Sequence, residues 1–172
     1  DLAAAIVERV RSYAKGTRSE RVSSEVSELV NKAVREFKRQ SGERVEVWVL
    51  QEQPVYIIVN PLEFELVIIN LLRNAAQALQ ELGVLNPKVA LTIKREDNKA
   101  LIAIEDNGHI EKEKIEKLSE PTNSTKADGL GLGLQIVRSI IENHGGKIFF
   151  SRAASGGLRV EIRLPAEETT EQ

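Results

Sequence analysis

The sequence predicts an α+β fold: a two-layer α/β sandwich whose mixed, mostly antiparallel sheet carries helices on one face. Two observations lead to this prediction. Segments with alternating apolar residues come in pairs, and segments with apolar residues at helical spacing separate the pairs. Strands paired in hairpins, with helices between them, bury their apolar faces by packing as two layers. At 172 residues and 41% hydrophobic content, the chain can form one domain with a single core.

The first expected element is an amphipathic helix over residues 2–14, with an apolar stripe at Leu2, Ile6, Val7, Val10 and Tyr13. A helix this short is marginal alone, so the stripe must pack on something. Either it packs on its own domain, or it is the end of a longer dimerising helix. The chain lacks methionine and starts at Asp1, so we expect it to be a piece of a longer protein.

A second helix is expected to run as far as Arg39, with Ser23-Ser24 as its N-cap. Its apolar positions repeat at helical spacing at Val26, Leu29, Val30, Ala33, Val34 and Phe37. Beyond Gly42, alternation predicts a strand over residues 44–49, and a short apolar run predicts another over residues 55–59.

Asn60-Pro61 predicts the start of a long helix, with Asn as N-cap and Pro in the first helical position, and Gly83 ends it. The buried face is expected at Leu62, Leu66, Ile69, Leu72, Ala76 and Leu79. Within it, Asn70 and Asn74 are four residues apart, so their side chains lie one turn above the other. They either bond to neighbouring backbone or face a polar cavity, and we favour the cavity.

Two further strands, over residues 88–95 and 100–104, are expected to form a hairpin that ends in Asp106-Asn107-Gly108. An acid followed by glycine can be a plain turn, or a carboxylate held beside a close backbone approach. A short charged helix over residues 111–118 and a polar connector over 119–128 follow.

Residues 128–134 alternate three glycines with leucines and lead directly into a helical pattern. Glycine lets backbone N–H groups approach an anion, and a helix start adds unpaired N–H groups, so the stretch suits phosphate. It is neither a P-loop nor the dinucleotide fingerprint. The alternative is a flexible loop that caps a core helix.

Gly145-Gly146 ends that helix. We read His144 as structural, because it lies at the helix end, where a cation suits the helix dipole. A last hairpin is expected over residues 147–151 and 158–164.

The composition excludes several classes of function. The net charge of −2 and 4% aromatic content do not favour a nucleic-acid partner. The absence of cysteine and the presence of only two histidines exclude thiolate and His-rich metal sites. No apolar run approaches the roughly 18 residues of a membrane span, and no signal-peptide pattern opens the chain. We therefore expect a cytoplasmic location without direct membrane contact, whether or not the parent protein spans a membrane.

In this order and spacing, the polar features resemble the ATP-binding catalytic domain of sensor histidine kinases, in the GHKL superfamily. Residues 70–75 resemble the N box, residues 106–108 the G1 box and residues 128–133 the G2 box. Residues 142–148 resemble the passage from helix to strand that follows the G2 box in that family, and residues 159–165 resemble its closing strand. The resemblance implies the Bergerat-type version of the sandwich, with a short mobile ATP lid.

The resemblance also implies roles for single residues, with ATP and Mg²⁺ as cofactors. Asp106 would accept a hydrogen bond from the adenine amino group, and Gly108 would leave room for the ring. The nucleotide-binding set is Asn74, Gln77, Asp106, Gly108, Thr125, Lys126, Gly129, Leu130, Gly131, Leu132 and Gly133, and the catalytic set is Asn70, Asn74 and Lys126. Asn74 would be the Mg²⁺ ligand, and Lys126 would neutralise the γ-phosphate.

The resemblance implies transfer of the ATP γ-phosphoryl group to a histidine on a dimerisation domain that this chain does not contain. That domain and a response regulator would be the partners, and the parent protein would be a homodimer. Residues 1–20 would then be the end of a dimerisation helix with a linker, residues 21–165 the catalytic domain and residues 166–172 a disordered acidic tail.

Three departures from the family pattern keep two alternatives open. The G1 box continues as His109-Ile110 without a second glycine, the usual phenylalanines before the lid are absent, and Leu158 stands where a threonine usually backs the adenine-binding acid. A non-enzymatic interaction module of the same fold is one alternative. The other is a GHKL enzyme that hydrolyses ATP, but such ATPases carry a glutamate at the position of Asn70, and an amide cannot act as that base.

Overall fold

The computed structural model describes residues 20–42, 44–120 and 131–168, and it confirms the α+β fold with a mixed sheet. In chain order the elements are β1 (Val22–Glu25), α2 (Val26–Ser41), β2 (Glu46–Gln51), β3 (Tyr56–Val59), α3 (Pro61–Leu82), β4 (Lys88–Glu96), β5 (Lys99–Asp106), α4 (Lys112–Ser119), α5 (Gly131–Asn143), β6 (Lys147–Arg152) and β7 (Leu158–Pro165). The expected helix over residues 2–14 lies outside the described residues.

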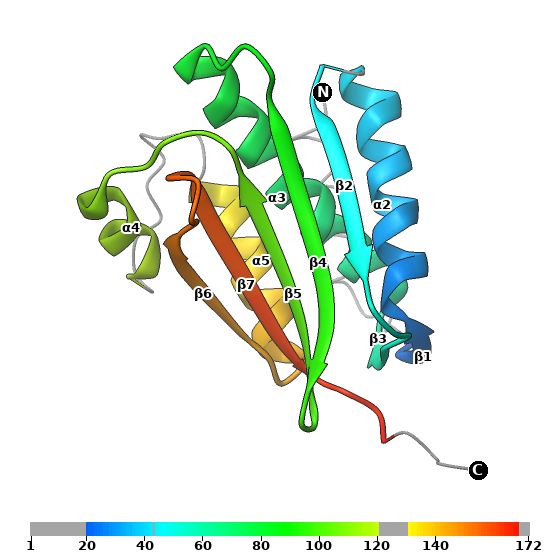
Figure 1. Cartoon of the computed structure of the whole chain (residues 1–172). Coiled ribbons are helices and arrows are strands. Elements are labelled where there is room, and N and C mark those ends of the chain that lie inside the picture. Colours follow the sequence, from blue (N-terminus) through cyan, green and yellow to red (C-terminus); the bar gives the residue numbers. More distant parts are fainter. Residues whose placement is uncertain (1–19, 43, 121–130, 169–172) are drawn as a thin grey trace.

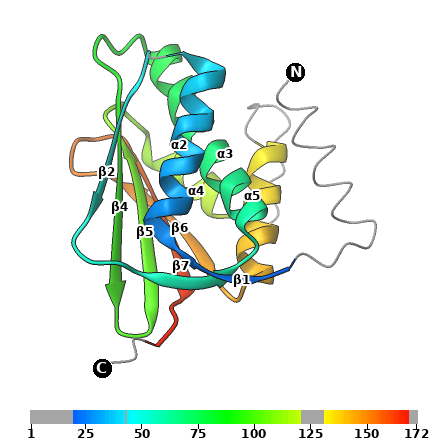
Figure 2. The ribbon, with the colours of Figure 1, turned by 90° about the vertical axis from the view of Figure 1, so that its right-hand side faces the viewer.

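The main sheet has five strands in the order β2-β4-β5-β7-β6 (Figure 1). Only the β2–β4 pair is parallel, and the other three pairs are antiparallel. Helices α2, α3 and α5 cover one face of this sheet, as the two ribbon views show (Figure 2). The short helix α4 instead lies beside β6 at the edge (Figure 1).

One predicted pairing is wrong. Strands β2 and β3 do not form a hairpin with each other: β2 pairs with β4 in parallel, and β3 pairs with β1 in a separate two-stranded sheet. The segment Ser23-Ser24 lies in β1, which we did not expect, and Glu25 is the N-cap of α2 instead. Periodicity identifies a strand but not its partner, so neighbours along the chain were taken for neighbours in space.

Helix α3 is the central helix of the core, and its ends agree with the prediction. The Asn60 carboxamide accepts a hydrogen bond from the Glu63 N–H at 2.9 Å, and Gly83 ends the helix with a φ of 67°. Leu66, Ile69, Leu72 and Leu79 are buried as expected, whereas Ala76 is only half-buried and Leu62 is 41% exposed. None of the helices described combines the length and hydrophobicity needed to cross a membrane.

The start of α3 is bound to the end of α5 through His144. This buried ring accepts the Asn60 backbone N–H at Nε2, at 3.2 Å, while Nδ1 lies 2.7 Å from the Ile140 carbonyl oxygen. These two contacts are those of a neutral ring with its proton on Nδ1. His144 is therefore structural as expected, but its hydrogen bonds are not those of a cation at a helix end.

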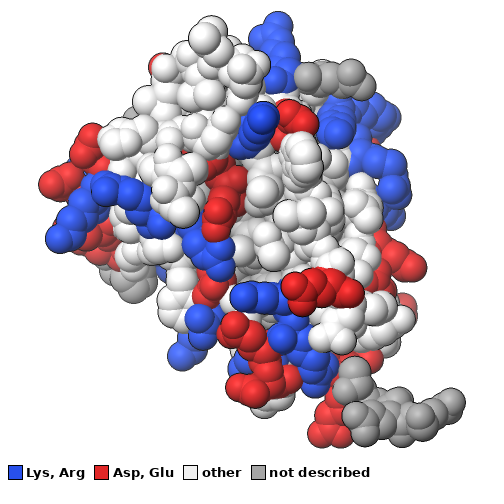
Figure 3. All heavy atoms as spheres, viewed as in Figure 1, with Lys and Arg blue, Asp and Glu red and all other residues white. Residues whose placement is uncertain are grey.

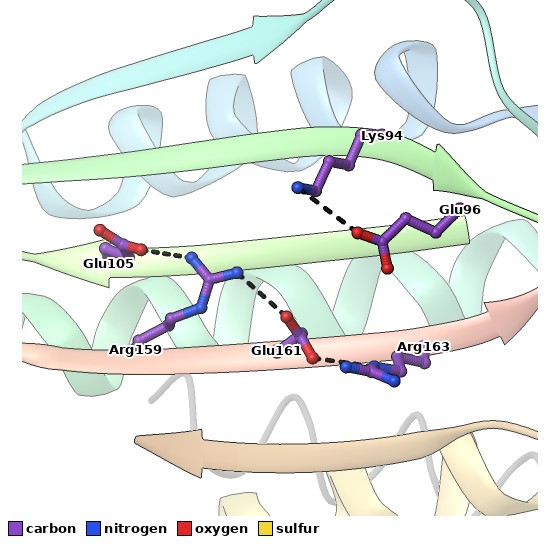
Figure 4. A network of polar contacts seen from close by, with 6 residues as sticks. All are labelled: Lys94, Glu96, Glu105, Arg159, Glu161 and Arg163. Atoms are coloured by element: carbon purple, nitrogen blue, oxygen red, sulfur yellow. Dashed lines mark hydrogen bonds and ion pairs between the residues drawn. The ribbon is translucent and has the colours of Figure 1, made fainter. Parts of the chain in front are cut away.

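The opposite face of the sheet carries mixed charges beside an uncharged area (Figure 3). A row of side chains on β5 and β7 forms consecutive ion pairs, from Glu105 through Arg159 and Glu161 to Arg163 (Figure 4). Trp48 and Leu50 on the edge strand β2 are about half exposed on this side, at 51% and 52%. The charged side chains of the row are half-buried at most and keep contact with solvent, so such pairs contribute modestly to stability and the fold depends mainly on the apolar layer behind the sheet.

The first residues after β7 are hydrogen-bonded to the domain. The Ala166 N–H donates to the Asn98 carbonyl at 2.9 Å, and the Glu167 N–H donates to the Tyr56 carbonyl at 2.8 Å. These first two residues of the predicted tail are thus tied to the β4–β5 turn and to β3. Residues 169–172 lie outside the described residues, and the domain boundaries stay a prediction.

Replacing Asn60 by Ala tests the N-cap of α3 and leaves the backbone N–H that binds His144 in place. N60A removes the capping carboxamide, so the free energy of unfolding should fall by about 1 kcal/mol. A urea titration followed by circular dichroism measures it. The control is N86A, because Asn86 is exposed and the hydrogen bond that it forms within the described residues is through its backbone carbonyl. An equal loss in both variants would contradict the cap.

Candidate functional site

A cavity of about 340 Å³ lies between α3, α4 and the ends of strands β5 and β7. Asn74 of α3 and Asp106 of β5 both line it, although they are far apart in sequence. Most of the remaining wall is apolar and comes from Leu71, Ala75, Ala78, Ile104, Ile110, Leu134, Phe150, Leu158 and Val160. A hollow of this size with few polar groups suits a flat, largely apolar ligand such as a nucleobase.

Asp106 is the most constrained polar residue of the cavity. Its side chain is buried, and Oδ1 accepts the Gly108 N–H at 2.9 Å and the Leu158 N–H at 3.3 Å. No hydrogen bond within the described residues engages its other oxygen, Oδ2. One oxygen therefore anchors the carboxylate to the backbone, and the other is available to accept a hydrogen bond from a ligand.

The loop between β6 and β7 fits closely around this carboxylate. A Cβ added at Gly157 would lie 2.2 Å from the Asp106 backbone oxygen and 2.3 Å from Oδ1, so no other residue fits there without displacement. A Cβ added at Gly108 would meet Leu79 and Leu82 at 3.0 Å and 3.1 Å, which is tight but not prohibitive. Asp106-Asn107-Gly108 is thus the second of the two expected arrangements, a carboxylate beside a close backbone approach.

Burial determines the acidity of Asp106. Loss of solvent raises the pKa of this carboxyl above its usual value, and the hydrogen bonds from the Gly108 and Leu158 N–H groups oppose that rise without cancelling it. Raised carboxyl pKa values inside cavities are typical of functional sites.

Asn70 and Asn74 lie on one side of α3 but in different surroundings. Asn74 lines the cavity, whereas Asn70 is 4% exposed and lies against α5. A Cβ added at Gly133 would lie 3.1 Å from the Asn70 Oδ1, so the glycine lets the two helices approach. The Asn70 Nδ2 has no hydrogen-bond partner among the residues described. A buried, unpaired amide beside a helix start is a group that a ligand or water can satisfy.

The other predicted site residues have mixed outcomes. Gln77 is exposed, does not line the cavity, and donates to the Glu81 carboxylate at 3.3 Å. Gly131, Leu132 and Gly133 lie in the first turn of α5 as described, not in a loop that precedes the helix. Four predicted residues lie outside the described residues: Thr125, Lys126, Gly129 and Leu130.

The segment after Asp106 is bound to both neighbouring elements. Asn107 accepts the Lys88 N–H at its side-chain oxygen, at 2.8 Å, and donates to the Asn86 carbonyl at the same distance. The Ile110 N–H donates to the Gly156 carbonyl at 3.1 Å. The segment that follows Asp106 is therefore held by the start of β4 on one side of β5 and by the β6–β7 loop on the other, even though it lacks the second glycine of the G1 pattern.

Sequence reasoning missed the wall on the α4 side of the cavity. Glu111, Lys114 and Leu118 line it from α4 and its N-cap, and Phe150 lines it from β6. These residues fall in no motif, and an alternating strand pattern does not reveal which aromatic residue borders a cavity. The signal that existed was the pair of apolar residues Ile115 and Leu118 in a helix whose other residues are mostly charged.

The described residues offer little for holding a metal by themselves. They contain no cluster of three or more histidine, cysteine, aspartate or glutamate side chains with that geometry. A divalent cation near Asn74 would therefore depend on one amide oxygen, on water and on the ligand's own oxygens. Mg²⁺ tolerates this arrangement, because it usually retains several waters and takes its other ligands from phosphates.

Comparison with known proteins gives a consistent result. The family model described as histidine kinase-, DNA gyrase B-, and HSP90-like ATPase matches residues 59–168. Sensor protein TdiS of Thauera aromatica is 32% identical over 96% of this chain and 31% of its own length. Sporulation kinase B of Bacillus subtilis is 37% identical over 58% of this chain and 23% of its own length. The chain thus spans less than a third of these relatives.

Solved structures agree in fold. The catalytic domain of histidine kinase ThkA, in a nucleotide-free form, superposes with a TM-score of 0.71 at 27% identity and covers 85% of this chain and 95% of that one. The histidine kinase domain of the E. coli osmosensor EnvZ superposes with a TM-score of 0.65 at 24% identity and covers 92% and 96%. The second likeness concerns the fold alone.

The raised pKa of Asp106 predicts how stability changes with pH. Because the folded state binds this proton more tightly than the unfolded chain, the group favours folding below its unfolded pKa of about 3.9, and that contribution is lost as pH rises through the higher folded pKa. Urea titrations between pH 7 and pH 4 should show the wild type gaining stability relative to D106N as pH falls. A constant difference, or a change of opposite sign, would contradict the burial argument.

Proposed function

The chain belongs to the family of histidine kinase-, DNA gyrase B-, and HSP90-like ATPases, and from this membership we propose that it binds Mg–ATP and transfers the γ-phosphoryl group to a protein histidine. Its fold and recognised relatives are those of the ATP-binding domains of sensor histidine kinases. The acceptor histidine would belong to a dimerisation domain outside this chain. His144 is buried among backbone partners and is no candidate acceptor.

A single observation supports this function best: a buried carboxylate with one free oxygen shares a cavity with Asn74. The adenine amino group is a donor, and Oδ2 of Asp106 can accept from it while backbone N–H groups hold Oδ1. Leu158 has no hydroxyl to offer, but two backbone N–H groups, from Gly108 and Leu158, still hold this carboxylate.

Asn70 favours transfer over hydrolysis. In the hydrolytic members of the superfamily a glutamate at this position takes a proton from water, and the neutral carboxamide of Asn70 cannot do so. Phosphoryl transfer itself needs little from the protein beyond positioning and charge neutralisation.

The phosphate end of the site is proposed from the elements that border it. Asn74 would supply an amide oxygen to Mg²⁺, and the N–H groups at the start of α5, at Gly131 and Gly133, would face the phosphates together with Gly129, Leu130 and Leu132. Thr125 and Lys126 would complete the charge neutralisation. Gln77 is a weaker candidate, because reaching phosphate would cost it the bond to Glu81.

The proposed partners follow from the activity. A kinase without its acceptor needs a dimerisation and phosphotransfer domain of the parent protein, presumed homodimeric, and a response regulator that receives the phosphoryl group. We propose that the domain works in the cytoplasm, where ATP is available, and does not bind nucleic acid.

The adenine contact can be tested by base preference. ITP carries a carbonyl where ATP has the amino group, so the wild type should bind an ATP analogue with Mg²⁺ about 10–100-fold more tightly than the inosine analogue, the size of one hydrogen bond to a charged group. D106N should lose most of that preference. Calorimetry measures both affinities. Equal affinity of the wild type for the two bases would refute the role of Asp106.

Transfer can be tested with γ-labelled ATP. The chain alone should incorporate almost no label, and it should label a separately added dimerisation domain of its parent protein. N74A should lower that labelling at least tenfold, because it removes the proposed Mg²⁺ ligand, while N86A should not change it. Strong labelling of the chain alone, or rapid phosphate release with no acceptor present, would overturn the assignment in favour of self-phosphorylation or hydrolysis.

A further inference from the structure

Helix α4 forms one wall of the cavity without being anchored in the core. None of its eight residues is buried, yet Lys114 and Leu118 line the cavity. A short helix with no buried side chain has little packing energy to hold it in place. Something other than the hydrophobic core must therefore determine where this wall lies.

Arg138 of α5 supplies the missing anchor. Its guanidinium donates to the Leu118 carbonyl in the last turn of α4, where the helix leaves carbonyl groups without intrahelical partners. A cation also suits the negative end of a helix dipole. This hydrogen bond joins α5, which carries Gly133 against Asn70, to the helix that forms the opposite wall.

The same guanidinium lies over the ring of Phe150, with its central carbon 5.3 Å from the ring centroid. Phe150 lines the cavity from β6, and β6 is the strand on which α4 packs. Arg138 therefore contacts both the helix and the aromatic ring that together form this wall. The phenylalanines usual before the lid are absent from residues 118–124, and Phe150 is the aromatic residue that the described cavity wall does contain.

We propose that Arg138 is a positioning residue for the nucleotide: it acts through Leu118 and Phe150 to hold α4 at the distance from α3 at which the cavity accepts a base. The inference rests on the proposed ATP binding and adds a residue that belongs to none of the motifs identified above. Arg138 is not itself assigned a contact with ATP, so its loss should loosen the site rather than remove a ligand.

The chain contains a matched control. Arg163 lies over the ring of Phe149, the residue before Phe150, at 5.0 Å, and it donates to the Glu161 carboxylate at 2.8 Å. Arg163 belongs to the row of ion pairs on the outer face of the sheet (Figure 4), and neither Arg163 nor Phe149 lines the cavity. R163M and R138M therefore remove the same kind of contact from opposite sides of the sheet.

The experiment compares the complete chain as wild type, R138M, R138K and R163M. Calorimetry with a non-hydrolysable ATP analogue and Mg²⁺ should show about tenfold weaker binding for R138M, or about 1.4 kcal/mol, and less than twofold change for R163M. R138K should recover only part of the affinity, because lysine keeps the charge and can donate to the Leu118 carbonyl but lacks the planar group that stacks on Phe150. Amide hydrogen exchange over residues 112–119 without nucleotide should accelerate in R138M only.

The outcomes separate this inference from the function on which it rests. If the wild type does not bind the analogue, the proposed function fails. If the wild type binds and R138M binds equally well, or if R163M loses as much, the inference alone is overturned. A merely structural role would lower the melting temperature of R138M but leave its affinity and the exchange of α4 unchanged. Should R138M fail to fold, F150L carries the same test, and unchanged affinity there would also overturn the inference.

Discussion

The candidate site depends on a buried carboxylate that the backbone holds from two directions. Asp106 accepts N–H groups from Gly108, on its own segment, and from Leu158, on the neighbouring strand β7. Burying a carboxylate is costly unless such partners are supplied, and here they occupy one oxygen only. These hydrogen bonds orient the carboxylate through Oδ1, and Oδ2 is the oxygen to which a ligand can donate.

The architecture supports this arrangement at several points. Antiparallel pairing of β5 with β7 brings the end of one strand to the start of the other, opposite Gly157. On the helical side, the start of α5 approaches the middle of α3 where Gly133 meets Asn70, and the end of α5 is joined to the start of α3 through His144 and Asn60. Helix α5 is therefore in contact with α3 near both of its own ends.

The opposite wall has a different character. Helix α4 has no buried residue, and the Arg138 guanidinium joins its last turn to α5 and to the ring of Phe150. One side of the cavity is thus built from core helices and strands, and the other from a helix that lies outside the core.

Much of this could be predicted from the sequence, because it depends on local chemistry. The capping signal at Asn60-Pro61, the four-residue spacing of Asn70 and Asn74, and the acid–glycine pair at Asp106 and Gly108 are properties of short segments. The sequence alone therefore determined α3 and the hairpin that ends in Asp106. Contacts between distant segments leave no local pattern. Only the tertiary structure decided that β3 pairs with β1, that the Leu158 N–H reaches Asp106, and that Arg138 lies between the end of α4 and the ring of Phe150.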